Sequence, residues 1–175
     1  MTMSPRLRKF MLTAHITFAV GWLGAVATFL ALAIPGLSSQ DMQMVRAAYL
    51  AMDLITRYVI VPLSFAPLIT GPVLSLFTPW GLFRHYWILA KLLITIISTI
   101  ILQIHLPPIS FLAATAANSA VFGSELYRMQ VQMVVAAVAA LFALLVATAL
   151  AVYKPRGMTP YGWRKQQEKR TVSPS

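Results

Sequence analysis

The sequence predicts an all-α fold, a polytopic membrane protein whose four transmembrane helices form a bundle with both termini in the cytoplasm. Composition is the first indication, since 59% of the residues are hydrophobic and 10% are charged, whereas about 25% charged residues are usual in a soluble domain. Four apolar runs also reach the ~20 residues that a spanning helix needs. Finally, Lys and Arg gather at the ends of these runs that face one side of the expected membrane.

The distribution of cationic residues predicts the orientation. The side with both termini carries ten of them: Arg6, Arg8, Lys9, Arg84, Lys154, Arg156, Arg164, Lys165, Lys169 and Arg170. The other side carries Arg46, Arg57 and Arg128. Because cytoplasmic loops are enriched in Lys and Arg, this pattern predicts a multi-pass membrane protein with both termini in the cytoplasm. The net charge of +10 then reflects topology and lipid headgroups, so the lipid bilayer is the expected partner and nucleic acid is not.

The first apolar run, about residues 10–34, carries an ionisable group inside the span. The run is longer than the ~7–15 apolar residues of a signal peptide, which predicts an uncleaved helix. His15 lies within it, and an ionisable side chain at such a depth is a candidate functional residue. At about 100° per residue, Trp22 shares the His15 face. Pro35 and Gly36 are predicted to end the helix.

The second run, about residues 54–77, is interrupted by Pro62, Pro67 and Pro72. Each proline removes a backbone donor and bends the helix. The freed carbonyl groups need partners in lipid, so the bent face should be buried against protein or ligand. Residues 38–52 mix polar and apolar side chains, which predicts an amphipathic helix on the outer surface that runs directly into the second span.

The third run, about residues 86–106, has one polar side. A stripe at helical spacing contains Lys91, Thr95, Ser98, Leu102 and His105. This side should face the bundle interior. Pro107 and Pro108 are predicted to end the helix, and an outer loop with a short helix in it is expected to reach residue 129.

The fourth run, about residues 130–153, contains no ionisable residue, and an alanine seam along it predicts helix packing. Residues 1–153 therefore form one transmembrane domain. The tail, residues 154–175, is basic and is predicted to be a flexible segment at the anionic cytoplasmic leaflet.

His15 and Lys91 are predicted to meet in one site, because each lies about five residues into its helix, roughly 7–8 Å from the same membrane face. Helical bundles bind haem through an imidazole from a facing helix, so the pattern predicts haem b with His15 as the metal ligand. The other assignments are Trp22 as a wall of the cofactor slot, Arg84, Arg8 or Lys9 as propionate partners, His85 as a second axial ligand, and Lys91 as a propionate partner, second ligand or proton donor.

Each assignment has a structural alternative. His15 could be a hydrogen-bonded contact between helices, and Lys91 could extend its ammonium group to the membrane surface. His85 could be an interface residue, and His105 could simply lie close to a loop. No His-x-x-x-His pair is present, so no tetrahedral metal site is predicted. The absence of cysteine excludes disulfides, Cys-ligated zinc, iron–sulfur clusters and thiol nucleophiles.

Three short motifs carry a resemblance to known families: His15 followed by Gly21-Trp-Leu-Gly24, then Pro67-Leu-Ile-Thr-Gly71, then Tyr86-Trp-Ile-Leu-Ala-Lys91. Over residues 7–153 the chain resembles small bacterial integral membrane proteins of unknown function. More distantly, it is similar to HemJ-type protoporphyrinogen oxidases and to the membrane domains of copper-resistance protein D. The oxidase resemblance implies that His15 is the haem ligand and Lys91 the essential, catalytic lysine. The chain departs from that pattern because its matching core has no second late histidine except His105, which affects the oxidase activity more than haem binding.

The leading functional hypothesis is a b-type haem-binding integral membrane protein with a redox or haem-handling role. If it is an enzyme, a membrane oxidoreductase is expected, acting with a membrane redox partner or as a homo-oligomer. A second hypothesis is a non-catalytic accessory or structural subunit that packs on a partner through its Gly and Ala surfaces. A third is a small transporter component, in which the second and third helices line a path and oligomerisation is required.

Overall fold

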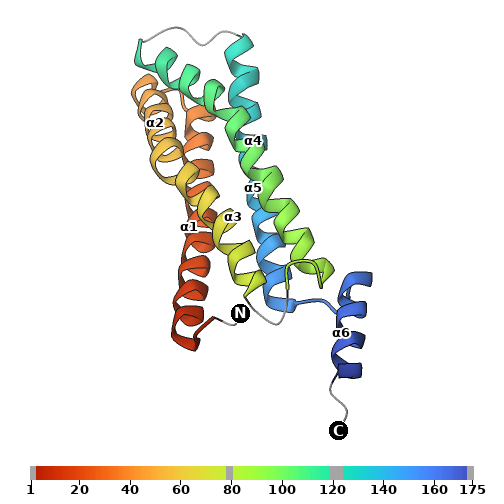
Figure 1. Cartoon of the computed structure of the whole chain (residues 1–175). Helices are drawn as coiled ribbons and strands as arrows, with labels where there is room; N and C mark the ends of the chain where they lie inside the picture. Colours follow the sequence, from red (N-terminus) through yellow and green to blue (C-terminus); the bar gives the residue numbers. More distant parts are fainter. Residues whose placement is uncertain (1–2, 78–80, 119–123, 173–175) are drawn as a thin grey trace.

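The computed structural model describes residues 3–77, 81–118 and 124–172, and within these ranges every regular element is helical (Figure 1). The elements are α1 (Pro5–Ser38), α2 (Met42–Ile55), the π-helical turn η1 (Thr56–Ile60), α3 (Val61–Leu76), α4 (Tyr86–Ala117), α5 (Ser124–Tyr153) and α6 (Pro160–Val172). Helices long and apolar enough to cross a membrane cover Pro5–Ser38, Met42–Leu76, Tyr86–Ala117 and Leu126–Tyr153. The predicted all-α bundle of four spans is confirmed.

The two termini lie at the same end of the bundle (Figure 1). We call this the terminal end; it contains the start of α1, the end of α3, the start of α4 and the end of α5. The opposite end, where α1 passes to α2 and α4 passes to α5, is called the distal end. This up-and-down arrangement is what short connections between successive spans require.

The prediction that Pro107 and Pro108 end the third span is wrong, because α4 continues through them to Ala117. Two features support the continuation. The hydroxyl of Ser110 donates to the carbonyl oxygen of Leu106 at 3.0 Å, and the segment beyond the prolines contributes buried side chains to the core. Figure 1 shows this distal part of α4 bending over α2. Packing on α2 thus outweighs the backbone donors that the two prolines remove.

Helix α1 also extends further than predicted, since it passes through Pro35 and Gly36 and ends at Ser38. Gly36 is buried, and a Cβ atom there would lie 3.1 Å from the ring of Tyr49. The glycine therefore lets α2 pack closely on the last turn of α1. This contact favours helix continuation where local sequence signals favour an end.

The predicted helix ahead of the second span exists and runs directly into it, through η1. It does not lie on the outer surface as expected, because Val45, Tyr49 and Met52 are buried in the bundle core. The irregularity expected from the prolines appears at η1, where the Val61 N–H donates to the carbonyl oxygen of Thr56, five residues back. This π-turn lies directly before Pro62, which has no backbone N–H to donate.

Close packing is concentrated at the distal half of the bundle. The largest fully buried side chains are Tyr49, Met52, Leu112, Met133, Thr56 and Ser64. Towards the terminal end the spans bury little: the first buried residue of α1 is Trp22, and before Ile109 the buried residues of α4 are Ile88 and Thr99. The distal half is therefore a packed core, whereas the terminal half leaves space between the helices.

Where the sequence predicted a flexible tail, the structure forms α6 and ties it to the residues before α4. The Thr159 N–H donates to the Arg84 carbonyl at 3.0 Å, and the Tyr86 N–H donates to the Gly157 carbonyl at 3.4 Å. Thr159 Oγ1 accepts from the Gly162 N–H at 3.1 Å, as a helix-capping hydroxyl does. A Cβ atom on Gly162 would lie 2.5 Å from the Arg84 carbonyl oxygen, so only glycine fits at this contact.

Candidate functional site

A cavity of about 730 Å³ opens at the terminal end, between α1, α3 and α4 and beside the end of α5. Its lining is Arg8, Lys9, Leu12, His15, Ile16, Pro67, Gly71, Pro72, Leu74, Ser75, Leu82, Trp87, Ile88, Lys91, Leu92, Thr95, Ala151 and Lys154. Most of these side chains are apolar, and none of these described residues is acidic. The cavity therefore suits a ligand with an apolar body and negatively charged groups.

His15 lines this cavity and is oriented by α3. Its Nδ1 atom lies 2.8 Å from the hydroxyl oxygen of Thr70, and that hydroxyl donates its single hydrogen to the Ala66 carbonyl at 2.7 Å. With that hydrogen directed to Ala66, Thr70 accepts from His15, and the arrangement favours a neutral imidazole with its proton on Nδ1. Nε2 keeps its lone pair and makes no hydrogen bond to the part of the chain that the structure describes.

Gly71 makes this close approach of the imidazole to α3 possible. A Cβ atom at Gly71 would lie 3.3 Å from His15 Cε1, which is tighter than most contacts of a real Cβ. The sequence left two alternatives for His15, a hydrogen-bonded contact between helices and a metal ligand. Both are possible together, because Nδ1 makes the contact and Nε2 remains available. A ligating histidine is usually held by its other ring nitrogen in this way.

Lys91 lines the same cavity from α4, so His15 and Lys91 border one site. The predicted equal distances from the helix starts are not observed, because α1 begins at Pro5 and α4 at Tyr86. Its ammonium nitrogen lies 5.9 Å from the centre of the Trp87 ring, which is a cation–π distance. Arg8, Lys9 and Lys154 bring further positive charge to the lining. Lys154 follows the last residue of α5 with a φ of 44°, and its place in the sequence predicted no role beyond topology.

Trp22, Arg84 and His85, also predicted to hold the cofactor, do not line the cavity. Trp22 lies two turns further along α1, where the helices are packed together, and it is 3% exposed. His85 precedes the first residue of α4 and has extended backbone angles (φ −130°, ψ 134°), and its ring centre lies 6.3 Å from that of Trp87, which lines the cavity. Its backbone pairs with Met158.

His105 occupies a different part of the molecule, in the distal half of α4. Its Nδ1 donates to the carbonyl oxygen of Ile101 at 2.8 Å, a contact within its own helix. Among the described residues, no group of three or more His, Cys, Asp or Glu side chains could hold a metal ion. A single imidazole matches the chemistry of haem, in which the macrocycle supplies the other nitrogen ligands.

Thr70 is the residue of this site that sequence reasoning missed. It stands in the motif Pro67-Leu-Ile-Thr-Gly71, next to the glycine that admits the imidazole. A hydroxyl beside a glycine on a proline-rich span was a usable signal. Its partner could not be identified, because the sequence does not say which faces of α1 and α3 meet.

Comparisons of the chain with protein-family models, with curated proteins and with solved structures find no match. Functional inference therefore rests on the geometry of the chain's own residues.

Proposed function

We propose that the chain binds haem b in the cavity at the terminal end, with Nε2 of His15 as the axial ligand. The observation that carries the proposal is the His15–Thr70 hydrogen bond of 2.8 Å. It turns the protonated nitrogen towards α3 and leaves the other nitrogen unbonded on a ring that lines the cavity. Held in this orientation, the imidazole is prepared to bind a metal without reorganisation.

Size and charge support the same ligand. The cavity volume of about 730 Å³ falls within the ~300–1,000 Å³ usual for small-molecule and cofactor sites. Its apolar walls suit a porphyrin ring, while Arg8, Lys9, Lys91 and Lys154 offer partners for two propionates. Haem in this place would supply one-electron redox chemistry.

The chain's own residues would then hold the cofactor and control its surroundings. Thr70 would orient His15, and apolar side chains such as Leu12 and Leu92 would contact the macrocycle. Lys91, held near the Trp87 ring, is placed to neutralise a propionate or to donate a proton to a bound substrate. This arrangement supports a redox or haem-handling role, with Lys91 as the catalytic group if the protein is an oxidoreductase.

The proposed setting is the bacterial inner membrane, with the terminal end and its cavity on the cytoplasmic side. The excess of Lys and Arg at that end supports this orientation. A membrane redox partner, or a second copy of the chain, would exchange electrons with the haem.

Absorption spectroscopy tests the proposal. The detergent-purified protein should show a Soret band that shifts and sharpens on reduction with dithionite, and His15→Ala should abolish it. His105→Ala is the matched control, because that histidine bonds within its own helix. Full haem occupancy in the His15→Ala protein would disprove the assignment. A wild-type spectrum that stays featureless after haem is supplied would favour the accessory-subunit hypothesis.

A further inference from the structure

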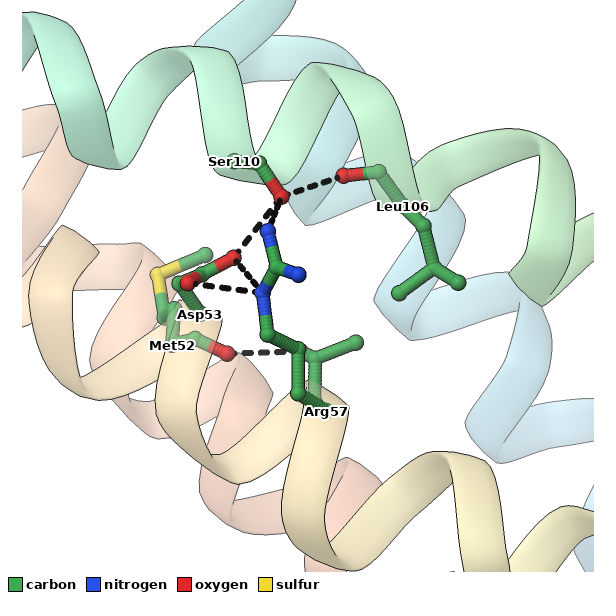
Figure 2. Close-up of polar contacts among 6 residues, drawn as sticks. Met52, Asp53, Arg57, Leu106 and Ser110 are labelled. Atoms are coloured by element: carbon green, nitrogen blue, oxygen red, sulfur yellow. Dashed lines mark hydrogen bonds and ion pairs between the residues drawn. The ribbon is translucent and has the colours of Figure 1, made fainter.

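A second polar site lies in the distal half of the bundle, away from the cavity. Figure 2 shows Asp53, Arg57 and Ser110 forming a cluster that joins the α2–η1 segment to α4. Arg57 Nε donates to both carboxylate oxygens of Asp53, at 3.0 Å each. Arg57 Nη2 donates to the Ser110 hydroxyl, whose single hydrogen is shared between Asp53 Oδ1 at 2.9 Å and the Leu106 carbonyl oxygen at 3.0 Å. The guanidinium is therefore fixed from two helices.

The cluster leaves part of the guanidinium without a partner. Arg57 Nη1 makes no hydrogen bond within the part of the chain that the structure describes. The Arg57 side chain is 51% exposed. It borders a groove of about 410 Å³ whose other lining residues are Val61, Leu106, Pro107 and Ser110. A charged group thus stands at one edge of a mostly apolar groove.

The position of Arg57 along the bundle identifies its surroundings. From Arg57 to Leu76, the last residue of α3, the helix rises about 28 Å. This is close to the ~30 Å thickness of the hydrocarbon layer. Placing the end of α3 at one boundary of that layer would put Arg57 near the other. Its unbonded N–H groups are then at the level of the phosphates of the distal leaflet.

We propose that this groove binds one phospholipid of the distal leaflet, with the lipid phosphate on Arg57. Asp53 and Ser110 hold the guanidinium at the edge of the groove, with Nη1 unbonded in the described part of the chain and the side chain 51% exposed. An acceptor bound in the groove can therefore reach it. Phosphate oxygens are the acceptors available at this depth and match the arginine geometry.

The remaining lining fits the rest of the lipid. Val61, Leu106 and Pro107 present apolar surface beside the charge, where the first part of an acyl chain would pack. The site is independent of the proposed haem cavity, which lies at the opposite end of the bundle.

Native mass spectrometry of the whole protein in mild detergent tests this inference. Titration with phosphatidylglycerol should show one tightly bound lipid, and Arg57→Gln should weaken its binding at least about tenfold, as expected for loss of a charge-assisted hydrogen bond. Arg46→Gln is the matched control, because Arg46 is an exposed arginine of α2 that does not line the groove.

Arg57→Gln also leaves Asp53 without its ion pair, so a second variant is needed. Val61→Trp fills the groove and keeps the charged cluster, and it should displace the lipid as well. Unchanged lipid binding in both variants would overturn the proposal. The proposal would also be overturned if diacylglycerol, which has no phosphate, bound as tightly as phosphatidylglycerol. The same holds if inorganic phosphate alone stabilised the protein as much as the lipid does.

Discussion

His15 combines a structural contact with an available metal-binding nitrogen. The hydroxyl of Thr70 accepts from Nδ1, and the same hydroxyl donates to the Ala66 carbonyl. This short chain of hydrogen bonds contains no charged group. It favours the tautomer that has its proton on Nδ1. One threonine therefore decides whether the imidazole presents Nε2 or Nδ1 as its basic nitrogen.

Replacing Thr70 by Val should weaken haem binding while leaving the fold intact. Without the acceptor, the ring loses its preferred tautomer and orientation, and loss of such a supporting contact costs about 10–100-fold in metal affinity. Haem titration followed at the Soret band measures the effect. Thr95→Val is the control, because Thr95 also lines the cavity but its hydroxyl donates to a carbonyl of its own helix. Equal affinities of the two variants would show that Thr70 does not orient His15.

The helices of this protein are shaped by prolines that do not terminate them. In α4 the residues after Pro107 and Pro108 remain helical because they pack on α2 and because Ser110 links to Asp53 and Arg57. The loop before α4 is shaped in a comparable way by the tail, through the contact of Gly162 with Arg84. Tertiary packing therefore determines where these helices end.

Gly162→Ala should release α6 from the loop before α4. The added methyl would lie 2.5 Å from the carbonyl oxygen of Arg84, whereas a Cβ at Gly157 would make an ordinary contact of 3.6 Å with Tyr86. Limited trypsin digestion of the detergent-purified protein should therefore cleave the tail several-fold faster in Gly162→Ala. Gly157→Ala should be cleaved like the wild type. Equal cleavage of all three proteins would mean that this contact does not hold α6.

At the scale of the whole molecule, packing and charge divide the bundle into two halves. The distal half holds the largest buried side chains, among them Tyr49, Met52 and Leu112. The terminal half contains the cavity and most of the Lys and Arg residues. A rigid half therefore supports an open half that can admit a ligand.

The charge asymmetry predicts that the terminal end lies in the cytoplasm. Green fluorescent protein fused to the C-terminus should fluoresce, and alkaline phosphatase in the same position should be inactive. Alkaline phosphatase inserted in the connection between α4 and α5 should be active, because that connection lies at the distal end. The reverse pattern would place the cavity on the outer side and would contradict the orientation.

Properties that depend on length and hydropathy were predictable from the sequence. These include the number of spans and the all-α class, because both follow from the length and hydropathy of the apolar runs. The predicted helix ends were less accurate. Pro35 and Pro107 are local stop signals, and tertiary contacts overrode both of them.

Which side chains face one another was decided by the tertiary structure. In a membrane span the residues that face lipid and those that face the core are equally apolar, so hydropathy does not distinguish the two faces. For this reason Trp22 was expected in the cofactor slot but lies in the core, and Thr70 was not recognised as the partner of His15. The groove beside Arg57 is lined by residues of η1, α3 and α4, so it depends on how these helices pack together and cannot be derived from any one of them.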